Sequence, residues 1–158
     1  MARKKHVLTF EEFLREKRIE QNKPGYKMVD WDIKKEQWLE AINNLYKIID
    51  EVIVDKLRKA GYNIAVEQEP VRIIEDYMGS YDTYNYILKT NSFKIRFCPI
   101  SAIMIQYNGR VDMILPKGTV KLILAENYTW KISQGFSVPM DLIDFNEKNI
   151  QRVFEDYL

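Results

Sequence analysis

The residues that could do acid–base or nucleophilic chemistry are few, and they lie far apart in the sequence. Cys98 is the only cysteine and His6 the only histidine among the 158 residues. Cys98 alternates with Lys94 and Arg96 along an apolar run, so two cations could stabilise its thiolate. No histidine or other base lies near Cys98 in the sequence, and the basic segment around His6 would hold a general base or a metal ligand poorly. The sequence therefore favours a structural cysteine and an exposed histidine.

Clusters that could bind a metal, a phosphate or a cofactor are not found in the sequence either. The two carboxylate pairs, Glu67 with Glu69 and Glu75 with Asp76, lie on or next to predicted strands, where a solvated sheet face accounts for them. There is no Cys/His cluster suited to zinc and no EF-hand spacing. The six glycines are all single, so no glycine-rich loop surrounds a phosphate. We expect no catalytic residue, no metal and no cofactor, and the sequence favours a protein that is not an enzyme.

Tyrosines give a stronger signal, and they indicate binding rather than catalysis. The chain has ten tyrosines, and Tyr77, Tyr81, Tyr84 and Tyr86 gather around Gly79 in a predicted loop. A tyrosine at a loop tip is a typical contact residue, because it combines a large rigid area with a polar end. The same rings could instead cover the end of a sheet. We predict Tyr77, Tyr81 and Tyr84 as binding residues.

A second candidate patch follows from an Asn-Gly pair. Asn108-Gly109 separates two alternating apolar runs, which is typical of a two-residue hairpin turn. With this turn, Arg110 and Asp112 lie two residues apart on the same face as Tyr107. We predict these three residues as a partner-binding patch; the alternative is that Arg110 and Asp112 form a buried ion pair.

The pattern around these candidates predicts an α+β fold built on an antiparallel β-meander of about six to seven strands. Four apolar runs between residues 92 and 132 are separated by breaks at Pro99, Asn108-Gly109, 116–118 and Glu126-Asn127. Upstream, the runs 64–67 and 71–77 flank a proline, which favours an edge position, and 78–82 reads as a loop. The strand that ends the sheet is predicted at 128–133.

Turn positions also predict the register of two hairpins. A turn at Asn91-Ser92 pairs the strand 84–90 with the run that follows, so that Leu88 faces Ile95 and Tyr86 faces Phe97. A turn at Lys117-Gly118 sets Leu115 opposite Val120. Both registers keep one face of the sheet apolar.

Helical spacing predicts three helices. Residues 33–60 carry a wide apolar stripe, with Asp32 as N-cap and Gly61 placed to end the helix. Thr9 begins a capping box for a short helix over 10–20. Apolar residues at helical spacing over 146–157 predict a closing helix. The long helix is expected to pack on the sheet.

Composition and charge set the domain organisation and the compartment. We expect residues 1–30 to form a basic arm, a short helix and a linker, and residues 31–158 to form a single α+β domain. The net charge is +1, so the field of the whole molecule does not require a nucleic-acid partner. A single cysteine suits a reducing compartment, and no apolar run is long enough to cross a membrane, so we expect a cytoplasmic protein.

Three functions remain open from the sequence. The favoured hypothesis is a non-enzymatic interaction module that binds another protein, with self-association not excluded. The alternative is nucleic-acid binding, in which Arg3, Lys4 and Lys5 contact phosphates and exposed aromatic rings stack on bases. The third hypothesis is an enzyme or small-ligand binder whose site is assembled from distant residues.

Overall fold

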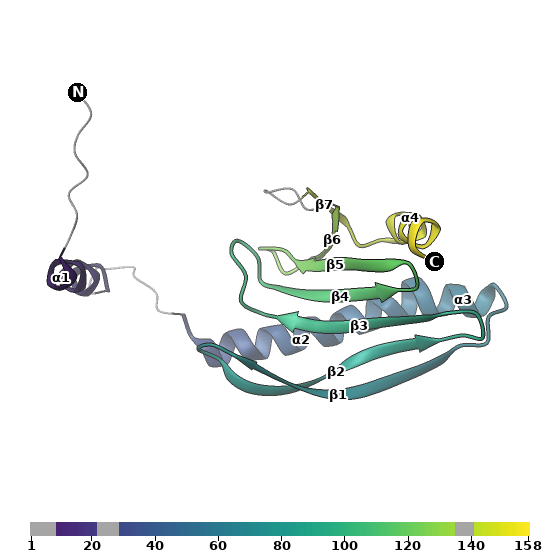
Figure 1. Cartoon of the computed structure of the whole chain (residues 1–158), viewed down its shortest axis with the longest axis horizontal. Helices are drawn as coiled ribbons and strands as arrows, with labels where there is room; N and C mark the ends of the chain where they lie inside the picture. Colours follow the sequence, from purple (N-terminus) through teal and green to yellow (C-terminus); the bar gives the residue numbers. More distant parts are fainter. Residues whose placement is uncertain (1–8, 22–28, 135–140) are drawn as a thin grey trace, which may run out of the picture. The chain divides into compact units, whose positions relative to one another are not determined.

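The computed structural model describes residues 9–21, 29–134 and 141–158. The chain divides into two units, Met1–Asp30 and Trp31–Leu158. The second unit has the predicted α+β architecture: an antiparallel sheet of seven strands in sequence order, with a long helix packed on it (Figure 1). The strands are β1 (Ala65–Glu75), β2 (Gly79–Lys89), β3 (Lys94–Ser101), β4 (Gly109–Leu115), β5 (Gly118–Leu124), β6 (Trp130–Gln134) and β7 (Asp141–Asp144).

The long helix consists of three consecutive segments. They are α2 (Trp31–Ile49), a π-helical turn η1 (Asp50–Val54) and α3 (Asp55–Lys59). The backbone is right-handed helical at both junctions, so the chain runs on from one segment to the next. The helix begins at Trp31, so the prediction that Asp32 is its N-cap was wrong and Asp32 lies in the first turn. Gly61 has a φ of +95°, and the Tyr62 N–H donates to the Leu57 carbonyl at 3.0 Å, which confirms the predicted end.

The apolar stripe of this helix and one face of the sheet form the core. Ile42, Leu45 and Ile49 are fully buried in one cluster. Val111, Met113 and Leu122 complete the shared core that the matching apolar patterns predict. Helix α4 (Glu147–Tyr157) begins at its N-cap Asn146 and adds Ile150 and Val153 to the same cluster.

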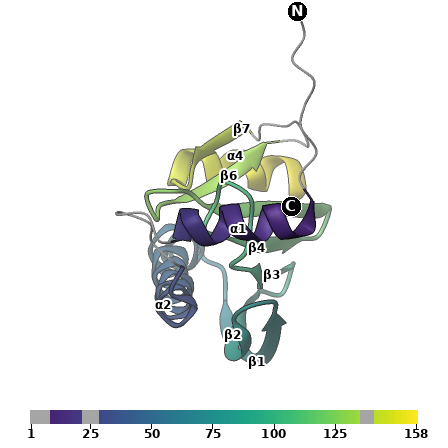
Figure 2. The same ribbon diagram turned by 90° about the vertical axis from the view of Figure 1, so that its left-hand side faces the viewer.

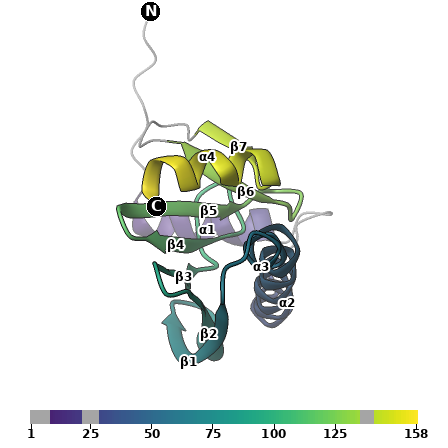
Figure 3. The same ribbon diagram turned by 90° about the vertical axis from the view of Figure 1, so that its right-hand side faces the viewer.

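Both helical elements of Trp31–Leu158 therefore lie against the same face of the sheet. Figures 2 and 3 show α2 along one side of the strands. Residues that alternate with the core positions, such as Arg110 and Asp112 in β4, belong to the opposite face. No helix of the described part of Trp31–Leu158 covers that face.

The other expected helix, α1 (Phe10–Gln21), belongs to the first unit. The Glu12 N–H donates to the Thr9 hydroxyl oxygen at 3.2 Å, which is the predicted cap.

The connection between β3 and β4 differs from the prediction. Asn108-Gly109 is not a two-residue turn: β3 ends at Ser101, and residues 102–108 connect it to β4. The Asn108 side-chain amide donates to the carbonyls of Ala125 at 3.0 Å and Glu126 at 3.2 Å, so it binds the β5–β6 connection instead of turning the chain. Tyr107 therefore lies in a loop rather than on a strand beside Arg110.

Pro99 was wrongly expected to break a strand. It is buried within β3 and lies opposite Val111 of β4. On its other side, β3 pairs with β2 only from Lys94 to Phe97, where Phe97 faces Tyr86 and Ile95 faces Leu88 as predicted. The sheet therefore splits beyond Phe97, and a residue without a backbone N–H is tolerated where β2 is no longer a partner.

Other element boundaries also differ from the prediction. The β4–β5 turn is Pro116-Lys117, so Leu115 faces Gly118 and the predicted register was wrong by two residues. That shift leaves every side chain on its predicted face. Strand β1 is continuous through Pro70 and is an edge strand, as the proline indicates. The predicted loop 78–82 is instead a tight turn at 76–78 followed by β2, and β7 was not predicted.

Candidate functional site

The predicted binding tyrosines do not share one surface. Tyr81 is only 5% exposed; its hydroxyl accepts a hydrogen bond from Trp38 Nε1 at 3.0 Å and donates one to the Glu75 carboxylate. Burial, together with that carboxylate, raises the pKa of Tyr81 above its ordinary value, so the hydroxyl stays protonated. Tyr81 is therefore part of the core that joins β2 to α2.

Tyr84 also serves mainly to join the hairpin to the helix. Its hydroxyl donates to Asn43 Oδ1 at 3.2 Å, and its carbonyl accepts from the Tyr46 hydroxyl at 2.6 Å. Tyr46 is buried in α2, and burial raises its pKa, so it remains a donor at any physiological pH. This hydroxyl satisfies a β2 carbonyl next to the place where β2 and β3 separate.

Tyr77 is the predicted tyrosine that lies on the surface. Its side chain is 78% exposed and stacks on the Trp31 ring, with centroids 5.3 Å apart and planes 16° from parallel. Tyr77 occupies the turn between β1 and β2 with a φ of +68°. The contact places this turn beside the start of α2.

Further contacts bring three connections together at this end of the unit. The Glu75 carboxylate accepts hydrogen bonds from the Ser101 hydroxyl and, at 3.0 Å, from the Ala102 N–H, which ties the β1–β2 turn to the 102–108 connection. Asn108 ties that connection to the β5–β6 connection, as described above. Figure 1 shows the arrowheads of β3 and β5 pointing toward the side where α2 begins. We call this region the loop end: the first turn of α2, the connections 76–78, 102–108 and 125–129, and the strand residues next to them.

Exposed apolar side chains concentrate at the loop end. Among the described residues of Trp31–Leu158, nine large hydrophobic side chains are exposed, and seven of them lie there. They are Ile33, Ile74, Tyr77, Ile100, Ile103, Ile105 and Tyr128. Ile105 is 89% exposed. Because exposed apolar residues that gather in one region mark interaction sites, the loop end is the strongest candidate surface.

Backbone strain falls in the same region. The described residues include three non-glycine residues with positive φ, and each lies in a different one of the three connections: Tyr77 (+68°), Gln106 (+70°) and Tyr128 (+58°). Such conformations cost about 1–3 kcal/mol each and are typical of functional sites. Two of the three residues are tyrosines whose side chains are exposed.

The three connections also have a distinct charge. They contain two carboxylates, Asp76 and Glu126, and no lysine or arginine. The three connections are therefore weakly acidic, whereas binding to a phosphate backbone or to an anionic membrane requires basic side chains.

Arg110 and Asp112 form a separate feature on the face of the sheet that the helices leave uncovered. Arg110 Nε lies 2.7 Å from Asp112 Oδ1 and Nη2 lies 3.0 Å from Oδ2, so the pair is bidentate. The two side chains are 30% and 15% exposed. The geometry is that of a half-buried ion pair.

This ion pair leads to a stability prediction. Arg110→Ala is expected to lower the free energy of unfolding by about 1–2 kcal/mol, because it leaves a half-buried carboxylate without its donor. Arg152→Ala, at an exposed arginine of α4, is the matched control and should change it by less than about 0.5 kcal/mol. Urea denaturation of both variants measures the difference. If Arg110→Ala loses as little free energy of unfolding as Arg152→Ala, the ion pair does not stabilise the fold, and Arg110 is better described as the contact residue that the sequence predicted.

The surroundings of Cys98 favour the neutral thiol rather than a thiolate stabilised by cations. Burial raises the pKa of the Cys98 thiol and outweighs the opposing effect of Arg96, while the carboxylate of Asp112, which lies opposite Cys98 in β4, raises it further. We therefore predict that iodoacetamide labels Cys98 more slowly in the folded chain than in the urea-unfolded chain at the same neutral pH. Equal rates in the two states would contradict this assignment.

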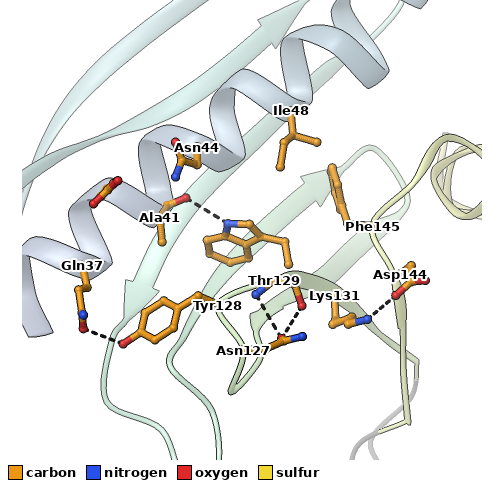
Figure 4. Close-up of a pocket in the computed structure, with 12 residues that line it drawn as sticks. Gln37, Ala41, Asn44, Ile48, Asn127, Tyr128, Thr129, Lys131, Asp144 and Phe145 are labelled. Carbon is orange, nitrogen blue, oxygen red and sulfur yellow. Dashed lines mark hydrogen bonds and ion pairs between the residues drawn. The ribbon is translucent and has the colours of Figure 1, made fainter.

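A groove lies beside the loop end, between α2 and the segment from the β5–β6 connection to β7 (Figure 4). Its volume is about 680 Å³. The α2 side contributes Gln37, Glu40, Ala41, Asn44 and Ile48, and the opposite side contributes Asn127, Tyr128, Thr129, Trp130, Lys131, Asp144 and Phe145.

Hydrogen bonds fix the shape of this groove. Trp130 Nε1 donates to the Ala41 carbonyl at 3.1 Å, and the Tyr128 hydroxyl donates to Gln37 Oε1 at 2.9 Å, so both aromatic residues bridge to α2 (Figure 4). Lys131 pairs with Asp144. Seven of the twelve lining residues are exposed, so the groove is open to solvent along its length rather than an enclosed cavity.

No family model, curated protein or solved structure matches this chain. The function must therefore be inferred from the loop end and the groove themselves. Within residues 9–21, 29–134 and 141–158, no group of three or more His, Cys, Asp or Glu side chains could hold a metal ion. Within those same ranges, no helix is both long and apolar enough to span a membrane. Arg3, Lys4 and Lys5 lie outside the described residues.

The sequence pattern missed most of the loop end. Ile103 and Ile105 were assigned to a strand, because the apolar run 102–107 alternates and ends at Asn-Gly. The one signal that could have indicated a loop is that this run has no charged residue. The groove residues Glu40 and Asn44 gave no signal, since they look like any solvated face of a helix.

Proposed function

We propose that this protein is a non-enzymatic interaction module that binds another protein through the loop end. The observation that carries the proposal is the concentration of seven of the nine exposed large hydrophobic side chains of Trp31–Leu158 at one end of the sheet. Covering such an apolar surface with a partner lowers the free energy of the complex. A cytoplasmic location is part of the same proposal.

The proposal is supported by how rigidly the surface is held. Glu75 and Asn108 link the three connections through hydrogen bonds to neighbouring backbone groups, and Tyr77 stacks on Trp31. A preorganised surface loses little conformational entropy on binding, so more of the contact energy appears as affinity. The positive φ values at Tyr77, Gln106 and Tyr128 fit the same role, because strained backbone conformations cluster at binding sites.

Charge supports a protein partner over nucleic acid. Phosphate binding requires lysine or arginine side chains, and the three connections have none. The two carboxylates at Asp76 and Glu126 would repel a phosphate backbone. Aromatic rings alone bind single strands only with the help of a basic groove.

The test begins with a photocrosslinking amino acid in place of Ile105, introduced in cells of the native host. Ile114, exposed in β4 at the opposite end of the strands, is the matched control position. We expect a discrete crosslinked partner from position 105 and none from position 114. The partner is then purified and its affinity measured.

Substitutions at the loop end should weaken that complex without unfolding the protein. Ile105→Ser and Tyr77→Ser are each expected to raise Kd by about tenfold or more, which corresponds to about 1.4 kcal/mol. Ile114→Ser should leave Kd unchanged. Titration calorimetry of the purified pair measures the values. If the partner binds Ile105→Ser and Tyr77→Ser as tightly as the unaltered protein, the loop end is not its binding surface.

A further inference from the structure

The groove between α2 and the β5–β7 segment has an unbalanced charge. Its lining contains three charged side chains, and two of them, Lys131 and Asp144, neutralise each other as an ion pair. The third, Glu40, makes no ion pair with any residue that the structure describes. Its neighbours on the helix at i−4, i−3, i+3 and i+4 are Glu36, Gln37, Asn43 and Asn44, so α2 itself supplies no cation.

The remaining lining residues suit the backbone of a peptide. The side-chain amides of Gln37 and Asn44 flank Glu40 on α2, and Asn127 lies on the opposite wall. The amide oxygens of Gln37 and Asn127 already accept hydrogen bonds from the Tyr128 and Thr129 hydroxyls, so these two residues offer a peptide the N–H donors that its carbonyls require, and Asn44 offers a donor and an acceptor. The lining also has apolar groups: Ala41 with the Trp130 indole bonded to its carbonyl, and Ile48 with Phe145 at one end (Figure 4). A chain in extended conformation could place polar backbone groups and apolar side chains against this lining.

Small and anionic ligands fit the groove less well. Small-molecule sites bury most of the ligand surface, whereas seven of the twelve lining residues here are open to solvent. An anion would need an unpaired cation, and the only cation of the lining is held by Asp144. A neutral or positively charged segment in extended conformation therefore suits this open groove better.

We propose that this groove binds an extended peptide segment that places a lysine or arginine side chain against the Glu40 carboxylate. The groove shares Asn127, Tyr128 and Thr129 with the loop end, whereas Glu40 and the other α2 residues of its lining lie outside the loop end. The cation of the peptide pairs with Glu40, its aliphatic stem lies along the apolar floor, and its backbone pairs with the amides on the two walls.

The proposal can be tested by selecting peptides from a random displayed library on the full-length protein. We expect the selected sequences to be enriched in lysine or arginine next to apolar residues. A second selection on Glu40→Lys should enrich aspartate or glutamate at the same position. A selection that yields no binding peptide, or peptides with no preference for a basic residue, would overturn the proposal.

The best peptide is then synthesised and titrated against matched variants by fluorescence anisotropy. Glu40→Gln should weaken binding at least fivefold, and Asn44→Ala should weaken it less. Glu51→Gln removes a carboxylate from an exposed position of the same long helix outside the groove, and it should leave the affinity unchanged. Because Glu40 is exposed, Glu40→Gln is expected to fold normally, and circular dichroism checks this.

Loop-end variants distinguish this inference from the proposed function. A peptide that loses affinity for Ile105→Ser but not for Glu40→Gln would support the loop end as a binding surface and overturn the groove assignment. A peptide that responds only to Glu40→Gln would support the groove whether or not a partner covers the loop end. Two-dimensional NMR provides the final check: the indole N–H signal of Trp130 should shift on peptide binding, and an unshifted signal would contradict the proposal.

Discussion

Ile49→Asp is expected to unfold Trp31–Leu158. Ile49 is 0% exposed and belongs to the cluster that joins α2 to the sheet, so the new carboxylate would be buried among apolar side chains. A buried charge without a partner costs several kcal/mol, and the whole stability of a domain is about 5–15 kcal/mol. Circular dichroism should show loss of the cooperative thermal transition.

Two further substitutions show whether the charge is the cause. Lys47→Asp places the same side chain two residues away at an exposed position of α2, and it should cost no more than about 1 kcal/mol. Ile49→Val keeps an apolar side chain and should cost about 0.5–1.5 kcal/mol. An Ile49→Asp variant that remains folded with an unchanged melting temperature would show that the helix does not pack as described.

The sequence was sufficient where short-range chemistry decides the structure. The apolar stripe over 33–60, the glycine at position 61, the cap at Thr9 and the helical spacing over 146–157 each depend on residues within a few positions of one another. These signals predicted the helices to within a few residues. Alternation of apolar and polar residues predicted which side chains of β4 and β5 face the core.

The sequence was not sufficient where two distant segments compete for the same groups. Asn108-Gly109 has the composition of a hairpin turn, but Asn108 binds carbonyls of the β5–β6 connection, and this contact between distant segments replaces the turn. The β4–β5 register was wrong by two residues because a two-residue shift leaves the apolar faces matched, so patterning cannot detect it. The sequence favoured a structural cysteine at Cys98, but the burial that raises the pKa of its thiol depends on how the sheet packs.

The candidate site shows the same division between local and distant information. Tyr77 was predicted as a contact residue because tyrosines gather around the predicted loop at Gly79, and a loop signal is a local feature. Tyr81 is buried because its hydroxyl is hydrogen-bonded to Trp38, which is distant in the sequence, and to Glu75, which lies on the neighbouring strand β1. The loop end as a surface depends on which connections meet, and that follows only from the strand order and the contacts of Glu75 and Asn108. A region assembled from three connections has no signature in any one of them.

Gly109→Ala should be the most damaging substitution at any glycine of the described part of Trp31–Leu158. A β-carbon at this position would lie 2.6 Å from Cε3 and 2.8 Å from Cη2 of the Trp38 ring, and closer still to Cζ3. Trp38 is buried, hydrogen-bonded to Tyr81 and packed against Trp130, so its ring cannot move aside. The φ of +155° adds backbone strain for any residue with a side chain.

Together these effects should cost about 3 kcal/mol or more, because overpacking of a core and an unfavourable backbone conformation each contribute about 1–3 kcal/mol. Gly79→Ala is the control that separates the two causes: Gly79 has a φ of +72°, but a β-carbon there would meet nothing within 4 Å, so it should carry the backbone cost alone. Urea denaturation of both variants measures the difference, and tryptophan fluorescence should change only in Gly109→Ala. If the two variants lose the same free energy of unfolding, the Trp38 ring does not pack tightly against Gly109. The contact between α2 and β4 at the loop end is then looser than the structure indicates.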